Sequence, residues 1–141
     1  MKNELDIDLE HLANRYPDAT KDLLELTEAL KLKELQREGK ENFLTYIKHM
    51  WPDFVEGRHH QIFAEKLELV AQGKLKRLIV NMPPRHTKSE FASTYFPSWV
   101  LGRNPKLKVM QITHTGELAF RFGRKVRDIV DSAAYQEVFP G

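Results

Sequence analysis

The chain has 141 residues, one domain's worth, which is long enough to bury a hydrophobic core. Its formal net charge is only +2, and it contains no cysteine, which excludes disulfides and thiolate metal sites. No apolar run approaches the ~20 residues that span a bilayer, and residues 1–8 are too acidic and polar for a secretory signal. We therefore expect a soluble intracellular protein.

Residues 1–40 are predicted to form an acidic helical arm, with seven Lys and Arg against ten Asp and Glu. A short helix fits residues 6–16, and a longer one runs from Asp18 to about Arg37 and ends at Gly39. Its apolar face is formed by Leu23, Leu26 and Leu30. The arm either binds a partner or a second subunit, or packs on the rest of the chain through its leucines.

Residues 41–141 carry fifteen Lys and Arg against ten Asp and Glu, a modest excess that suits a phosphate-containing partner without proving nucleic-acid binding. Helices are predicted for residues 41–50 and, before Gly73, for residues 58–72, each with apolar residues at helical spacing. His59 and His60 open the second of these helices. Neighbouring helical residues point about 100° apart, so this pair is not placed to chelate a metal.

A short loop then separates a predicted strand from a predicted helix. Residues 77–82 form a nearly continuous β-branched apolar run, typical of a strand buried on both faces. Beyond the loop, Phe91 and Tyr95 are four residues apart and share one helical face. Strand, tight loop and helix follow in the order that a phosphate-binding loop requires. Both signature glycine positions are changed, to Met82 and Thr87.

The loop residues suit phosphate chemistry. Lys88 would reach the β- and γ-phosphates, Ser89 would offer its hydroxyl to Mg²⁺, and Arg85 would stand near the γ-phosphate. Pro83 and Pro84 stiffen the loop entrance. If the glycine replaced by Thr87 has a positive φ, its β-branched side chain costs about 1–2 kcal/mol there. The alternative is a basic surface turn capped by Ser or Thr.

After the loop helix, residues 107–113 are predicted to form a second strand, and a helix follows with Thr115 as its N-cap. One face of this helix holds Leu118, Phe122, Val126 and Ile129. The rest of its surface carries Arg121, Arg124, Lys125 and Arg127. These cations suit a DNA backbone, a neighbouring subunit's nucleotide, or a solvated helix face.

The chain resembles a known family in several ordered motifs that together cover about a hundred residues. The loop matches Pro-Pro-Arg-His-Gly-Lys-Ser except at Thr87, and the other matches lie at residues 42–52, 59–61, 101–105 and 114–119. This pattern resembles the large terminase subunits of tailed bacteriophages, the ATPases that pump DNA into empty capsids.

The resemblance implies a P-loop NTPase of the RecA-like (ASCE) class, a three-layer α/β sandwich, incomplete here and preceded by N-terminal helices. It implies ATP and Mg²⁺ as ligands, with Lys88 and Arg85 catalytic and Ser89 holding the metal. Gln61 would read the adenine, and His59 or His60 would stack on the base. The full set of candidate nucleotide-binding residues is Gln61, His60, Pro83, Pro84, Arg85, His86, Thr87, Lys88, Ser89 and Glu90.

The implied partners are double-stranded viral DNA, the portal protein and the small terminase subunit, in a homo-oligomeric ring in the host cell cytoplasm. Residues 1–40 would form the arm and residues 41–141 the front part of the ATPase domain. The acidic Walker B strand and the nuclease domain of terminases would lie beyond this chain, leaving it inactive alone. Two alternatives remain: a helicase-type nucleic-acid ATPase, and a non-catalytic partner-binding module with a degenerate loop.

Overall fold

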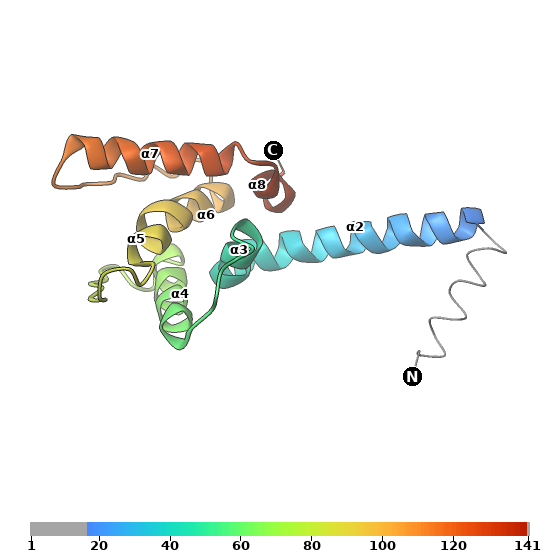
Figure 1. Cartoon of the computed structure of the whole chain (residues 1–141), viewed down its shortest axis with the longest axis horizontal. Helices are drawn as coiled ribbons and strands as arrows, with labels where there is room; N and C mark the ends of the chain where they lie inside the picture. The colour runs from blue at the N-terminus through green and yellow to red at the C-terminus, as the bar shows by residue number, and fades with distance from the viewer. Residues whose placement is uncertain (1–16, 141) are drawn as a thin grey trace. The chain divides into compact units, whose positions relative to one another are not determined.

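The computed structural model describes residues 17–140, and within this range it contains helices, turns and extended segments but no strand (Figure 1). The predicted three-layer α/β sandwich of a P-loop NTPase is therefore wrong, because that architecture is built around a central sheet. The chain divides into two compact units, and the division falls after Glu34. The sequence-based prediction places the boundary after residue 40. The helix predicted for residues 6–16 lies outside the described residues.

The two segments predicted as strands, residues 77–82 and 107–113, are extended without forming a sheet. In the first segment, half-buried and exposed side chains alternate along residues 78–82, the two-residue period of an extended chain. Among the described residues, no backbone hydrogen bond joins the two segments. Ile79 and Ile112 are 92% and 86% exposed. β-Branched composition favoured the extended backbone, but a sheet also needs a paired neighbour.

The helix α2 (Pro17–Glu41) continues past the glycine that we expected to end it. Gly39 is buried, and its carbonyl accepts a hydrogen bond from Trp99 Nε1 at 2.8 Å. A Cβ at position 39 would lie 2.8 Å from Val138 Cγ1. Gly39 therefore permits a close approach inside the second unit, and its prediction as a helix end is wrong.

The helices α3 (Phe43–Met50) and α4 (Arg58–Ala71) confirm the helices predicted in this region. Asn42 caps α3, with its Oδ1 accepting the N–H of Thr45 at 2.8 Å. The Glu68 carboxylate of α4 accepts the N–H of Phe43 at 2.7 Å. The first turn of α3 is thus held by its own cap and by α4.

The helix predicted after the loop consists of three segments that follow without a break: α5 (Lys88–Glu90), the π-helical η1 (Phe91–Tyr95) and α6 (Phe96–Arg103). A π-helical turn is wider than an α-helical turn, and such turns are frequent at functional sites. Thr94 Oγ1 in η1 is buried without a hydrogen-bond partner in the described chain.

The predicted helix after Thr115 is also present, as α7 (Gly116–Val130). Thr115 Oγ1 accepts the N–H of Leu118 at 3.3 Å, which confirms the N-cap. A last helix, α8 (Ala133–Val138), was not predicted; Ser132 caps it in the same way, at 3.3 Å from the N–H of Tyr135.

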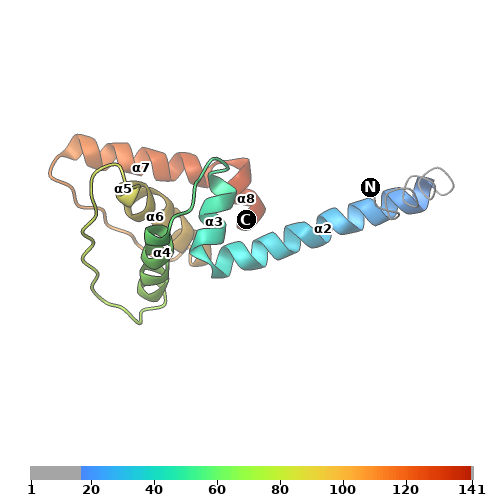
Figure 2. The ribbon, with the colours of Figure 1, turned by 60° about the horizontal axis from the view of Figure 1, so that its bottom comes forward.

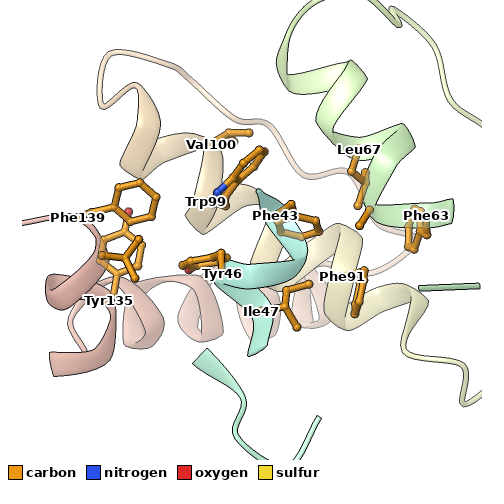
Figure 3. Packing of buried hydrophobic residues seen from close by; sticks show 12 residues of the cluster. Phe43, Tyr46, Ile47, Phe63, Leu67, Phe91, Trp99, Val100, Tyr135 and Phe139 are labelled. Atoms are coloured by element: carbon orange, nitrogen blue, oxygen red, sulfur yellow. The ribbon is translucent and has the colours of Figure 1, made fainter. Parts of the chain in front are cut away.

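The second unit has an aromatic core to which several helices contribute (Figure 3). Helix α3 packs against α4, α6 and α8, while α7 lies along η1 and α6 (Figures 1 and 2). The ring of Phe43 contacts those of Phe91 and Trp99, with centroids 5.7 and 5.2 Å apart. Nearby, Trp51 stacks on Tyr95 of η1, with ring centroids 6.1 Å apart. The core residues are Phe43, Tyr46, Ile47, Phe63, Ala64, Leu67, Phe91, Trp99, Val100, Tyr135, Val138 and Phe139.

Candidate functional site

The loop between the first extended segment and α5 surrounds a hollow of about 590 Å³. Nine consecutive residues line it, from Met82 to Glu90, and they include eight of the ten candidate nucleotide-binding residues. Small-molecule sites commonly occupy about 300–1,000 Å³. The loop alone therefore forms a concave surface of the right size for a small ligand.

The backbone of this loop is left-handed at two residues that are not glycine. Arg85 has a φ of 64°, and Thr87 has a φ of 57° with a ψ of 4°. Thr87 occupies the position where the resembled loop has glycine, so this position does take a positive φ. For a β-branched residue this conformation costs about 1–2 kcal/mol.

Two side chains in the hollow are cations without a partner among the described residues. Neither the Arg85 guanidinium nor the Lys88 ammonium makes a hydrogen bond or ion pair within residues 17–140. Lys88 and Ser89 begin the helical run that continues to Arg103. The hollow therefore has positive charge available to an anion.

The acidic residue of the loop is neutralised from α7. Glu90 Oε1 lies 2.6 Å from Lys125 Nζ, and both side chains are little more than a third exposed. This ion pair holds the end of the loop against α7 and offsets the negative charge at the rim of the hollow. Of the other predicted cations on α7, Arg127 pairs with Asp128 at 2.6 Å, whereas Arg121 and Arg124 are exposed and make no ion pair with a described residue.

His60 reaches the loop from the first turn of α4. Its Nδ1 accepts the N–H of Gly57 at 2.9 Å, so Nδ1 carries no proton. The proton is therefore on Nε2, which donates to Thr87 Oγ1 at 2.8 Å. The Thr87 hydroxyl in turn donates to the His86 carbonyl at 2.7 Å. Sequence reasoning assigned His60 to base stacking and missed this link, because residues 60 and 87 are far apart in the chain.

The environment of His60 favours its neutral form. The side chain is 6% exposed. Burial, together with the neighbouring His59 imidazole, lowers the pKa of His60 below its ordinary value. The rings of His59 and His60 lie 3.8 Å apart, and the ring of His86 lies 5.7 Å from that of His59. His86 Nδ1 donates to the Pro84 carbonyl at 3.0 Å, within the loop itself.

Gln61 is not brought to the loop. Its Nε2 donates to Glu56 Oε1, and Glu56 also pairs with Lys48. The Lys48 contact, followed by the Gln61 hydrogen bond, lowers the pKa of the Glu56 carboxyl. Gln61 lines a different hollow, of about 230 Å³, together with Glu65 and Glu68 of α4. The structure thus places Gln61 and His60 on different faces of α4, as neighbouring helical residues must be.

The described residues include no group of three or more His, Asp or Glu that would hold a metal ion by itself. In the same part of the chain, no helix is both long enough and apolar enough to cross a membrane. Comparisons with protein-family models, with curated proteins and with solved structures found no match for this chain. The likeness to terminases therefore depends on the residues quoted above.

Proposed function

We propose that the loop from Met82 to Glu90 binds the polyphosphate of ATP·Mg²⁺, and that the chain acts as a nucleotide-binding part of a terminase-type DNA-packaging ATPase. One observation carries the first part of this proposal. Two cations that have no partner among the described residues, Arg85 and Lys88, line a hollow of about 590 Å³ that is formed by a single stretch of the chain. A polyphosphate fits that combination of size and charge.

The roles of the loop residues follow from their chemistry. Lys88 would contact the β- and γ-phosphates as a point charge, while the Arg85 guanidinium would make paired hydrogen bonds to the γ-phosphate. Ser89 begins the helical run and would contribute one oxygen ligand to Mg²⁺. This ion normally takes its remaining ligands from water and phosphate oxygens, so a cluster of carboxylates is not required.

The DNA-packaging part of the proposal is supported by the ordered terminase-like motifs and by exposed Arg121 and Arg124 on α7. Exposed arginines on one helix suit a phosphate backbone. The partners are then double-stranded viral DNA, the portal protein and the small terminase subunit, with several copies forming a ring in the host cell cytoplasm.

Calorimetric titration with a non-hydrolysable ATP analogue and Mg²⁺ tests the binding proposal. Lys88→Ala should weaken binding tenfold or more, because a hydrogen bond to a charged group contributes about 1.5–3 kcal/mol. Lys74→Ala is the matched control, since Lys74 is exposed in the turn after α4 and lies outside the hollow. If the wild-type chain shows no heat of binding, or if both variants bind equally, the proposal is wrong.

Packaging of duplex DNA into proheads, compared with strand unwinding, tests the second part. A complete terminase-type protein that includes this chain should package DNA in an ATP-dependent way and leave duplex strands paired. ATP-dependent strand separation without packaging would instead indicate a helicase-type ATPase.

A further inference from the structure

Thr87 has a strained backbone conformation, and its hydroxyl makes two hydrogen bonds in addition to the one that its carbonyl accepts from the N–H of Phe91 at 2.9 Å. Its φ of 57° is an unfavourable backbone conformation for a β-branched residue. The hydroxyl accepts from His60 Nε2 at 2.8 Å and donates to the His86 carbonyl at 2.7 Å. Of these two contacts, only the one to His60 reaches outside the loop and can fix its position.

The ring of His60 is itself fixed in place. It stacks on Phe91 of η1, with centroids 5.2 Å apart, and meets Phe54 edge-on at 4.8 Å. Its Nδ1 is occupied by the N–H of Gly57 at 2.9 Å. These three neighbours orient the imidazole so that its Nε2–H points at Thr87 Oγ1.

We infer that His60 is a positioning residue for the phosphate loop: its Nε2–H holds Thr87 in the left-handed conformation that keeps the hollow open for the triphosphate. This inference rests on the proposed function, because it names a residue that prepares the same site. A glycine takes this backbone conformation freely. In this loop Thr87 adopts the left-handed conformation, and the hydrogen bond from His60 supplies the restraint that keeps it there.

The two ring nitrogens of His60 make different hydrogen bonds, and two substitutions can remove these hydrogen bonds separately. His60→Asn places an amide oxygen near the position of Nδ1, so it keeps the acceptor for Gly57 but loses the donor to Thr87. His60→Gln places an amide nitrogen near the position of Nε2, so it keeps the donor to Thr87. A role limited to the start of α4 would make Asn the milder change, whereas a role in the loop would make Gln the milder one.

The test measures the affinity of each variant for a non-hydrolysable ATP analogue with Mg²⁺. His60→Asn and Thr87→Val should each weaken binding about five- to thirtyfold, the factor that corresponds to the left-handed strain. The double variant should be no weaker than either single variant, because both remove the same contact. His60→Gln should bind nearly as well as wild type. In a Thr87→Gly background, His60→Asn should have no further effect.

Equal affinities for the Asn and Gln variants, or additive losses in the double variant, would overturn the inference. An NMR measurement separates this failure from a failure of the proposed function. The Nε2 proton of His60 should exchange slowly with water in the wild type and rapidly in Thr87→Val, with no nucleotide present. Slow exchange without any nucleotide binding would overturn the proposed function and leave the His60–Thr87 contact standing, while rapid exchange in the wild type would show that the contact is not formed.

Discussion

The contact between α6 and α8 can be tested with a single methyl group at Gly102. Gly102 lies in the last part of α6, and a Cβ there would come within 2.6 Å of both Phe139 Cγ and Tyr135 Oη. Neither neighbour moves aside easily. Tyr135 Oη donates to the Ser98 carbonyl at 3.0 Å, and the rings of Tyr135 and Phe139 lie 5.1 Å apart in the core.

The size of the effect follows from three contributions. Overpacking at a fixed site costs about 1–3 kcal/mol, and losing the Tyr135 hydrogen bond costs about 0.5–1.5 kcal/mol. Replacing a helical glycine by alanine returns about 1 kcal/mol. Gly102→Ala should therefore lower the free energy of unfolding by about 0.5–3.5 kcal/mol.

Urea denaturation of the full chain measures this change, as a shift in midpoint at constant slope. Gly123→Ala in α7 is the matched control, because a Cβ there would meet nothing within 4 Å. The control should raise the free energy of unfolding by about 0.5–1 kcal/mol, through helix propensity alone. If Gly102→Ala is as stable as the wild type or more stable, α8 does not pack on α6 as described.

Two further predictions concern the loop. Lys125→Ala should weaken ATP-analogue binding severalfold at low salt, because it leaves the Glu90 carboxylate unpaired at the rim of the hollow. Adding Glu90→Gln to this variant should restore the affinity. An unchanged affinity in Lys125→Ala alone would contradict this role. The lowered pKa of His60 means that, as pH falls from about 6.5 towards that pKa, the unfolded chain binds more protons than the folded chain. The free energy of unfolding should therefore decrease over this range, and it should decrease less in His60→Asn. Urea denaturation at pH 7.5 and at about pH 5.5 measures both changes. An equal change in the free energy of unfolding between the two pH values in both proteins would refute the prediction.

Most of the helices could be predicted because their signals are local. Leucine and phenylalanine spacing indicated α3, α4 and α7, and Thr115 was correctly identified as a cap. The short α8 was missed because its stability comes from Tyr135, Val138 and Phe139 packing into the core, a contact that no local pattern shows. Gly39 was misinterpreted for the same reason, since its neighbour is Val138, almost a hundred residues away in sequence.

The two predicted strands show where composition stops being informative. Residues 77–82 form the nearly continuous apolar run that predicted a buried strand, and their backbone is extended as expected. Pairing, however, depends on a second segment at hydrogen-bonding distance, and residues 107–113 do not supply it. An extended backbone could be predicted from these residues, but a sheet could not.

The sequence predicted where the candidate loop lies in the chain, but it predicted only part of the geometry of this loop. The sequence indicated the loop and its cations, and it predicted strain at Thr87 if this position has a positive φ, which the structure shows at 57°. The hydrogen bond from His60 could not be found in this way, because a helix N-terminus and a loop are brought together only by the aromatic packing of Phe54 and Phe91.

The stacking of Trp51 on Tyr95 has a practical consequence for optical measurements. The chain has only two tryptophans. Trp99 is fully buried in the core, whereas Trp51 lies half-buried against the π-helical turn that follows the loop. A Trp99→Phe variant would therefore keep Trp51 as its single tryptophan. Its intrinsic fluorescence would report movements of that turn during ligand titration, without a covalent dye.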